Sequence, residues 1–144
     1  MLLVIFASAF AVSNRSKYII RDTISNLEIN SLANIELEIK ADRRNCTINI
    51  QNKSDGNIVF DFTQRPMVIE IWQDDGWHEI VSTKYTIWPT EAVSKHSEYS
   101  FDIEWKDLID GVLKPGKYRA IFYYGDQKVS TWEFFNTVDE FEVK

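Results

Sequence analysis

The 144-residue sequence is poor in cysteine and histidine, and both shortages narrow what the chain can be. Cys46 is its single cysteine, so a fold held by intramolecular disulfides is excluded. A nucleophilic cysteine needs a partnered histidine, and neither His78 nor His96 is close to Cys46 along the chain. The alternating pattern NCTINI puts Cys46 on one strand face with Ile48 and Ile50. We therefore expect a buried thiol that packs as a small hydrophobic group.

The sequence also lacks an excess of positive charge. Its formal net charge is -6, and its longest cationic run is Arg43-Arg44 within DRRN, which is typical of a solvated turn. Binding to nucleic acid needs clustered Lys and Arg to neutralise phosphates. The composition therefore predicts a mildly acidic protein with no nucleic-acid partner.

Motifs for enzyme chemistry are missing as well. The sequence has no Gly-x-Ser-x-Gly elbow, no phosphate-binding loop and no paired Cys or His at zinc spacing. Its acidic pairs fall in turns or alternate along strands, where carboxylates are normally solvated. The sequence thus predicts a protein that is not an enzyme, with no catalytic residues, no cofactor and no metal site.

Long hydrophobic runs are absent except at the start, MLLVIFASAFA. This run ends in small residues at Ala9 and Ala11, as do the hydrophobic region and cleavage site of a secretory signal, although no Lys or Arg precedes it. Eleven residues are too few for a membrane-spanning helix, which needs about 20. We interpret residues 1–11 as a leader, which predicts an extracellular or cell-envelope location. The alternatives are a buried strand in a cytoplasmic protein and an uncleaved anchor.

The rest of the chain divides into a linker and one domain. Residues 12–31 show no clean period and are predicted as a linker, with a short element around Tyr18 to Ile20. Residues 32–144 show alternating apolar and polar residues between turn signals, which predicts an antiparallel β-sandwich of about seven or eight strands. The predicted strands are IELEI (35–39), CTINI (46–50), IVFDF (58–62), MVIEIWQ (67–73), WHEIV (77–81), YSFDIEW (99–105), KYRAIFYY (117–124) and VDEFEVK (138–144).

Three irregular features interrupt this alternation. The turn residues DDG at 74–76 predict a hairpin, and KDLIDG at 106–111 is long enough for one helical turn. The spacing of Val138, Phe141 and Val143 indicates a bulge or an irregular start in the last strand. The chain between Gly125 and Thr137 is predicted to be a lengthened connection.

The segment LKPGKY indicates how the chain crosses between two sheets. Pro115 fixes φ and Gly116 allows a sharp bend, after Leu113 and just before a strand begins. Tyr118 then enters the strand early enough for its hydroxyl to reach back to the backbone, which is the tyrosine corner of immunoglobulin-like domains. The alternative is a Pro-Gly hairpin followed by an ordinary core tyrosine.

The stretch YSFDIEWKDLIDGVLKPGKYRAIFYY resembles the C-terminal half of a family of bacterial immunoglobulin-like domains found in exported proteins of Gram-positive bacteria. The shared features are a strand ending in Trp105, a turn with Leu108, and Leu-x-Pro-Gly-x-Tyr-Arg at residues 113–119. INIQNKSDGNIVF and VIEIWQDDGWHEI are similar to earlier strands of the family. The resemblance covers residues 32–144 and implies an immunoglobulin-like antiparallel β-sandwich without catalytic residues. A sandwich family that includes the BsuPI-type intracellular proteinase inhibitor is similar at the corner.

Tryptophan is abundant, with five residues in one domain. Trp105 is expected in the core, whereas Trp72 and Trp77 flank the predicted hairpin turn. The others fall in predicted connections, where exposed aromatic side chains favour binding of a protein or a glycan. The candidate binding patch consists of Trp88, Tyr123, Trp132, Phe134 and Phe135. The alternative is that these rings fold back and cap the sandwich.

Two functions follow from these patterns. The first is a non-catalytic interaction module of an exported or cell-envelope protein, with a protein or glycan ligand and with membrane contact only through an uncleaved leader. The second is a proteinase inhibitor of the BsuPI type, in which an extended loop at residues 82–97 or 125–137 blocks an active site.

Overall fold

The computed structural model describes residues 18–60, 67–81, 91–126 and 134–144. Within these ranges the chain forms ten strands and one short helix, the antiparallel β-sandwich that the sequence predicted. The elements are β1 (Ile19–Ile20), β2 (Ile35–Ala41), β3 (Asn45–Asn52), β4 (Ile58–Phe60), β5 (Met67–Gln73), β6 (Gly76–Val81), β7 (Glu91–Val93), β8 (Ser97–Glu104), α1 (Trp105–Leu108), β9 (Gly116–Asp126) and β10 (Phe134–Val143).

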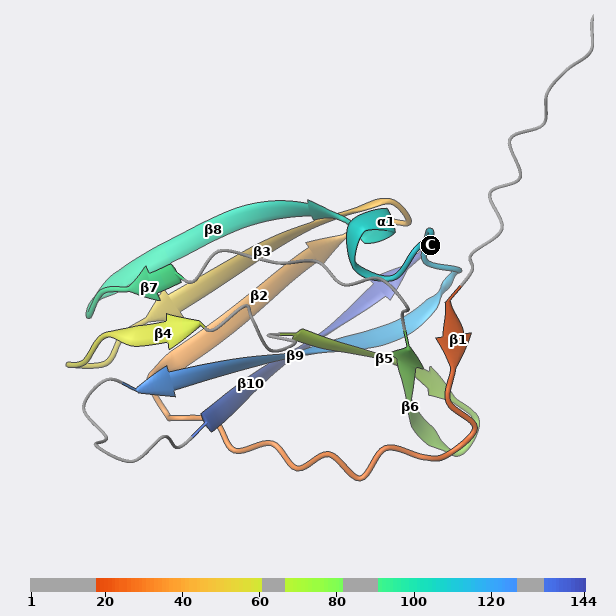
Figure 1. Ribbon diagram of the computed structural model, residues 1–144, viewed down its shortest axis with the longest axis horizontal. Helices are drawn as coiled ribbons and strands as arrows, with labels where there is room; N and C mark the ends of the chain where they lie inside the picture. The colour runs from red at the N-terminus through yellow and green to blue at the C-terminus, as the bar shows by residue number, and fades with distance from the viewer. Residues whose placement is uncertain (1–17, 61–66, 82–90, 127–133) are drawn as a thin grey trace, which may run out of the picture.

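The strands form two sheets that face each other across the core (Figure 1). One sheet has three strands in the order β2-β3-β8. The other has seven strands in the order β1-β6-β5-β9-β4-β7, and β10 pairs with the remaining side of β9. All of the pairings are antiparallel, and consecutive strands such as β2 and β3 or β5 and β6 are joined by short turns.

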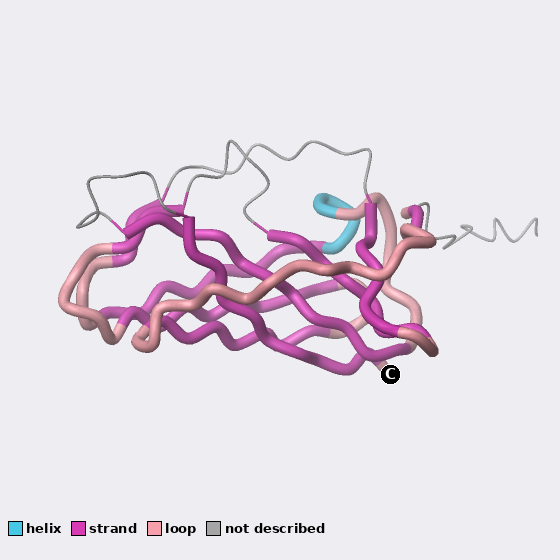
Figure 2. The backbone as a smooth tube through the Cα atoms, turned by 90° about the horizontal axis from the view of Figure 1, so that it is seen from below, coloured by secondary structure: helices cyan, strands magenta, loops and turns pink. Residues whose placement is uncertain are grey.

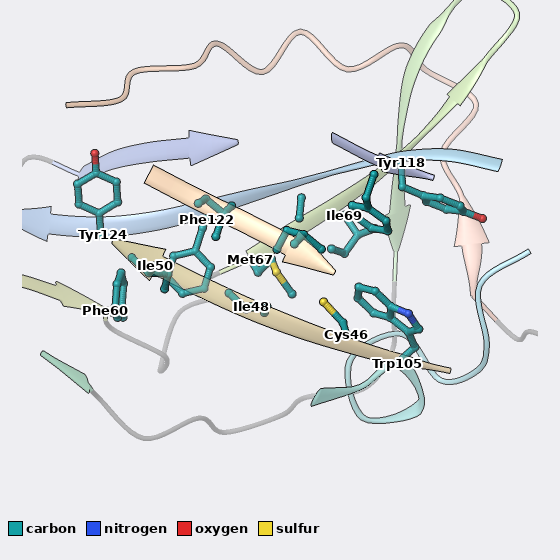
Figure 3. Close-up of a cluster of buried hydrophobic side chains, with 14 of the residues drawn as sticks. Cys46, Ile48, Ile50, Phe60, Met67, Ile69, Trp105, Tyr118, Phe122 and Tyr124 are labelled. Atoms are coloured by element: carbon teal, nitrogen blue, oxygen red, sulfur yellow. The ribbon is translucent and has the colours of Figure 1, made fainter. Parts of the chain in front are cut away.

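The core consists of the inward-facing residues of both sheets, as the alternating pattern predicted. Along β2 the residues alternate between buried and exposed, and Ile48 and Ile50 of β3 are completely buried. Figure 3 shows these side chains with Phe60, Phe122 and Trp105 between the two layers. Cys46 lies in the same cluster with 1% of its surface exposed, so its predicted burial is confirmed.

The single helix in the described residues, α1, is a four-residue turn that directly follows β8. No helix in the described part of the chain has the length and the apolar character needed to cross a membrane. The main role of α1 is to place Trp105, which is fully buried as predicted.

The last strand differs from its prediction. β10 begins at Phe134 and pairs with β9 residue by residue, from Phe134 opposite Gly125 to Val143 opposite Gly116. The pairing contains no bulge, so the predicted irregular start is wrong. The alternation was obscured because Asn136 and Thr137 are buried polar residues on this strand. The connection between β9 and β10 is therefore shorter than the range 125–137 that was predicted.

Residues 19–32, which we call the strap, run across the outer face of the seven-stranded sheet before the chain enters β2. Figure 2 shows this segment crossing the strands. β1, at its start, pairs with β6, and farther along the chain the amide of Ser25 donates to the carbonyl oxygen of Trp77 at 2.7 Å. Most of the predicted linker, residues 12–31, thus lies against the sandwich where the structure describes it. Residues 1–11, the predicted leader, are outside the described residues.

Candidate functional site

The LKPGKY segment forms a corner in which a side chain holds the backbone. The Tyr118 hydroxyl donates a hydrogen bond to the carbonyl oxygen of Lys114 at 2.7 Å, on the upstream side of Gly116. Burial raises the pKa of Tyr118, so the hydroxyl keeps its proton and stays a donor. Leu113 is fully buried behind the corner, whereas Pro115 is exposed. Of the four residues predicted for the corner, Tyr118 is the one whose side chain bonds the backbone in the described residues.

The corner is tied to the turn between β2 and β3. The amide of Leu113 donates to the carbonyl oxygen of Arg43 at 2.9 Å, and the Trp105 indole donates to that of Asp42 at 2.9 Å. Phe141 of β10 lies between the Trp105 and Tyr118 rings, with centroid distances of 6.0 and 5.7 Å. These contacts join the corner, the β2–β3 turn and β10 at this end of the sandwich.

The candidate aromatic patch is only partly described, and its described members lie on two faces. Trp88 and Trp132 are outside the described residues. Phe135 is opposite Tyr124 in the β9–β10 pairing and packs against the core, with a ring centroid 6.0 Å from that of Tyr124. Tyr123 is opposite Asn136 and therefore points to the outer face of the sheet. The backbone of Phe134 pairs with Gly125 at the end of β10.

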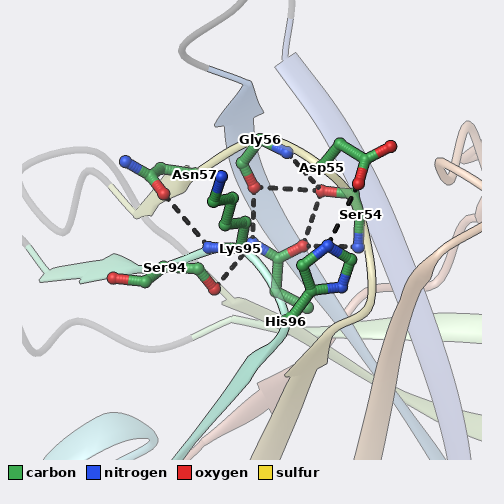
Figure 4. A network of polar contacts seen from close by, with 8 residues as sticks. Ser54, Asp55, Gly56, Asn57, Ser94, Lys95 and His96 are labelled. Carbon is green, nitrogen blue, oxygen red and sulfur yellow. Dashed lines mark hydrogen bonds and ion pairs between the residues drawn. The ribbon is translucent and has the colours of Figure 1, made fainter.

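The opposite end of the sandwich, which we call the far end, contains the turns after β3 and β7. Figure 4 shows the polar network that joins them. Asn52, with 1% of its surface exposed, donates from its side-chain nitrogen to carbonyl oxygens of Gly56, Val93 and Ser94 at 2.8, 3.0 and 3.1 Å. Its side-chain oxygen accepts from the amide and the hydroxyl of Ser54. One buried amide thus fixes both turns.

Two exposed contacts extend this network. The amide of Lys95 donates to the Asn57 side chain at 3.1 Å, and His96 lies 3.0 Å from the Asp55 carboxylate. His96 has a φ of 54°, in the left-handed region that L residues adopt only in tight turns. The far end therefore presents backbone and polar side chains in a fixed arrangement.

The outer face of the seven-stranded sheet carries a buried ion pair. Glu70 of β5 is fully buried, and one of its carboxylate oxygens accepts a hydrogen bond from the Arg119 guanidinium of β9. Its other oxygen, Oε1, is buried without a hydrogen-bond partner. Ile121 is also fully buried, although it does not belong to the main core cluster. The strap crosses this face, and we attribute the burial of both residues to it.

Two tryptophans lie beside this ion pair at the β5–β6 hairpin. Trp72 and Trp77 are cross-strand partners whose rings meet edge to face, with centroids 5.2 Å apart. The Arg119 guanidinium lies 4.8 Å from the Trp77 ring centroid, and the Lys117 ammonium lies 5.4 Å from it. Trp77 is thus held by cation–π contacts, whereas Trp72 is 47% exposed.

His78, with 2% of its surface exposed, joins the strap to the same hairpin. Its Nδ1 lies 2.8 Å from the carbonyl oxygen of Arg21, and its Nε2 lies 2.8 Å from the carboxylate of Asp75. Both neighbours are acceptors, so both ring nitrogens act as donors in the protonated ring. The hydrogen bond to Asp75 raises the pKa of His78 and lowers that of Asp75.

The thiol of Cys46 is buried and protonated. Burial raises the pKa of Cys46 to about 12, which keeps the thiol protonated and unreactive. Within residues 18–60, 67–81, 91–126 and 134–144, no group of three or more His, Cys, Asp or Glu side chains is placed to hold a metal ion.

The buried polar residues Glu70, His78 and Asn52 were not predicted from the sequence. Glu70 and His78 are buried polar residues of β5 and β6, and no local pattern indicates the contact of His78 with Arg21, which is 57 residues away in the sequence. Val93 and Ser94, whose carbonyl oxygens accept from the Asn52 side chain, lie 41 and 42 residues farther along the chain. A pattern within a short stretch of sequence does not indicate contacts between residues so far apart.

Comparison with known proteins identifies one family. A family model described as a bacterial Ig-like domain matches residues 27–134, which include the corner, the far end and the second half of the strap. No curated protein matches the chain.

Proposed function

This chain belongs to the bacterial Ig-like domain family, and from that membership we propose that it is a non-catalytic interaction module of an exported or cell-envelope protein. Ig-like sandwiches carry their functions on grafted loops and surfaces, so the fold gives the class of role and not the ligand.

The observation that carries the proposal is the arrangement of the two ends. The described chain starts next to the corner, where the Tyr18 hydroxyl accepts from the Lys114 amide at 3.4 Å. The C-terminal strand ends there too, because Val143 pairs with Gly116. Tyr18 and the C-terminal end of β10 thus lie at the corner end of the sandwich, opposite the far end (Figure 1).

The far end also provides a rigid base for binding. Its turns are fixed by Asn52, and Asp126 pairs with Ile58 directly after the first of these turns. Residues 127–133 join Asp126 to Phe134 and contain Trp132, one of the candidate patch residues. We propose that a protein or glycan ligand binds at this end through aromatic residues, because large rings on a rigid base give contact area at low entropic cost.

Binding is tested with the full chain and isolated bacterial cell envelopes in a co-sedimentation assay. Trp132→Ala and Trp88→Ala should each lower the sedimented fraction at least several-fold. Trp72→Ala is the matched control, because Trp72 is an exposed tryptophan on the hairpin near the corner. Binding lost only in Trp72→Ala would contradict the far-end proposal.

Export is tested separately with a reporter enzyme that is active only outside the cytoplasm. A fusion carrying residues 1–31 should give activity, and a fusion carrying residues 12–31 should not. Equal activity of the two fusions would contradict a leader in residues 1–11.

The alternative role as a proteinase inhibitor predicts sub-micromolar inhibition of a serine protease by the purified chain, which the interaction module should not show.

A further inference from the structure

The sandwich holds the strap through side chains that bind its backbone. Asn136 of β10 accepts from the Asn30 amide at 2.7 Å and donates from its side chain to the carbonyl oxygen of Glu28 at 3.1 Å. Its own amide donates to the carbonyl oxygen of Asn30 at 3.1 Å. At the end of the strap, the Tyr124 hydroxyl accepts from the Leu32 amide at 2.9 Å.

The groups that bind the strap are buried side chains with fixed positions. Asn136, Tyr124 and His78 are exposed by 7%, 1% and 2% respectively. All three contact main-chain atoms of the strap, as when an extended peptide is recognised through its backbone. If the strap leaves, these polar groups lose their partners, and such losses are costly unless another segment replaces it.

The strap itself gains little from apolar burial. The described residues include four large hydrophobic side chains that are exposed, and three of them lie on the strap: Ile19, Ile24 and Ile29, with exposures of 63%, 52% and 39%. Apart from Leu32, which packs against the core, opening therefore exposes little apolar surface of the strap, so opening costs less than breaking the core.

The hinge that connects the strap to the sandwich is short. Residues 33–34 form a turn between the strap and β2, and it is closed by a hydrogen bond of 3.2 Å from the Ile35 amide to the carbonyl oxygen of Leu32. Short hinge turns favour exchange of a terminal segment between copies, because extending the turn relieves its constraint. An extended strap of 14 residues reaches roughly 45 Å, which is enough to cross a second sheet.

We propose that the strap is exchanged between two copies of this chain, so that residues 19–32 of one copy occupy the outer face of the other. The strap of a second copy fits because it has the same sequence as the strap that already makes these contacts within one copy. The exchange keeps the contacts of Asn136, Tyr124 and His78 and changes only the hinge. Because the hinge is at the far end, two exchanged copies meet there.

Pairs of single-cysteine variants test the exchange directly. Cys46→Ala is combined with Asn30→Cys in one variant and with Asn136→Cys in the other, since these residues are hydrogen-bonded neighbours. Mixed at high concentration and oxidised, they should form a disulfide-linked heterodimer. The control pairs the Asn30→Cys variant with Ser100→Cys, also in Cys46→Ala, because Ser100 is exposed on the three-stranded sheet. A heterodimer yield at least about tenfold above the control supports exchange, and a yield equal to the control overturns it.

A second measurement keeps Asn136 intact. Isotopically light and heavy full-length chains are mixed at high concentration, diluted and analysed by native mass spectrometry, where exchange predicts a mixed dimer that persists after dilution. Three Gly or Ser residues inserted between residues 33 and 34 should lower the dimer fraction several-fold, because a longer hinge lets each strap return to its own sheet. A chain that stays monomeric, or a dimer unaffected by the insertion, overturns the proposal.

Discussion

Glu70 and Arg119 form an ion pair between β5 and β9 on the outer face of the sheet, with side chains only 1% and 12% exposed. The register places Glu79 directly opposite Glu70 on β6, so two like charges face each other across the strands. Like charges in that position are destabilising. Arg119 offsets the repulsion at Glu70, and Arg21 of the strap offsets it at Glu79, where its Nε lies 2.8 Å from a carboxylate oxygen. The strap thus supplies the cation for one glutamate of this pair of like charges, and β9 supplies the cation for the other.

Removing one partner of this pair should be costly. Arg119→Met leaves the Glu70 carboxylate buried without compensation, and we expect the free energy of unfolding to fall by about 3–5 kcal/mol. The double variant Glu70→Met/Arg119→Met removes both charges and should recover most of that loss. Urea unfolding followed by circular dichroism measures both variants.

An exposed ion pair on the neighbouring strands serves as the comparison. Lys117 and Glu140 lie 2.7 Å apart with both side chains about half exposed. Lys117→Met should change the free energy of unfolding by less than about 1 kcal/mol, since water solvates the carboxylate that remains. Equal losses in Lys117→Met and Arg119→Met would contradict the special role of the buried pair.

Asn52 should be the most important polar side chain of the far end. Asn52→Ala removes hydrogen bonds to three backbone carbonyls and to Ser54, and we expect a loss of about 3 kcal/mol. Asn49→Ala is the matched control on the same strand, because the Asn49 side-chain oxygen is buried without a partner. Urea unfolding that gives the larger loss for Asn49→Ala would contradict this assignment.

The strands of the sandwich were predictable because one face of each is buried, which forces apolar and polar residues to alternate. The pattern of β2 shows this most clearly. Prediction failed where tertiary contacts replace apolar burial. β10 begins at Phe134 although Asn136 and Thr137 break the alternation, because the Asn136 side chain binds the strap.

The candidate site was less predictable than the fold for the same reason. The corner is local, since the Tyr118 hydroxyl reaches only four residues back, and its residue types were visible in the sequence. The strap contacts of Asn136 span 106 and 108 residues, so no pattern within a short window reports them. Tyr123 and Phe135 were grouped as neighbours, but strand alternation puts them on opposite faces.

The Cys46 thiol should be unreactive in the folded protein. Its pKa is raised to about 12 and it is 1% exposed, so neither thiolate nor access is available at pH 8. Ellman's reagent should therefore release no colour from the native chain and one equivalent after unfolding in urea. Rapid stoichiometric reaction of the native chain would contradict burial of the thiol.

The stability of the strap-bearing hairpin should depend on pH through His78. The folded-state pKa is raised above the ordinary value of 6.5, so the protonated ring stabilises the folded chain fully below that pH. As the pH rises through the folded-state pKa, this contribution is lost, because the neutral ring has one N–H for two acceptors. The free energy of unfolding in urea should therefore fall on the alkaline side of pH 6.5.

Two variants assign this fall to the correct histidine. His78→Gln should remove it, whereas His96→Gln should keep it, because His96 lies at the far end and is 59% exposed. Amide exchange of Arg21 and Ser25, which donate to Glu79 and Trp77, should speed up over the same pH range beyond the intrinsic rate. A fall that persists in His78→Gln would show that another group is responsible.

The corner gives the last prediction. Tyr118→Phe keeps the buried ring against Phe141 and removes only the hydrogen bond to the carbonyl oxygen of Lys114. Because Lys114 is exposed and its carbonyl can turn to water, we expect the free energy of unfolding to fall by about 1 kcal/mol. Tyr99→Phe is the control, since that half-buried ring has no hydroxyl contact in the described residues, and it should change stability by less than about 0.5 kcal/mol. Equal effects of the two substitutions in urea unfolding would show that the corner hydrogen bond contributes nothing beyond the ring.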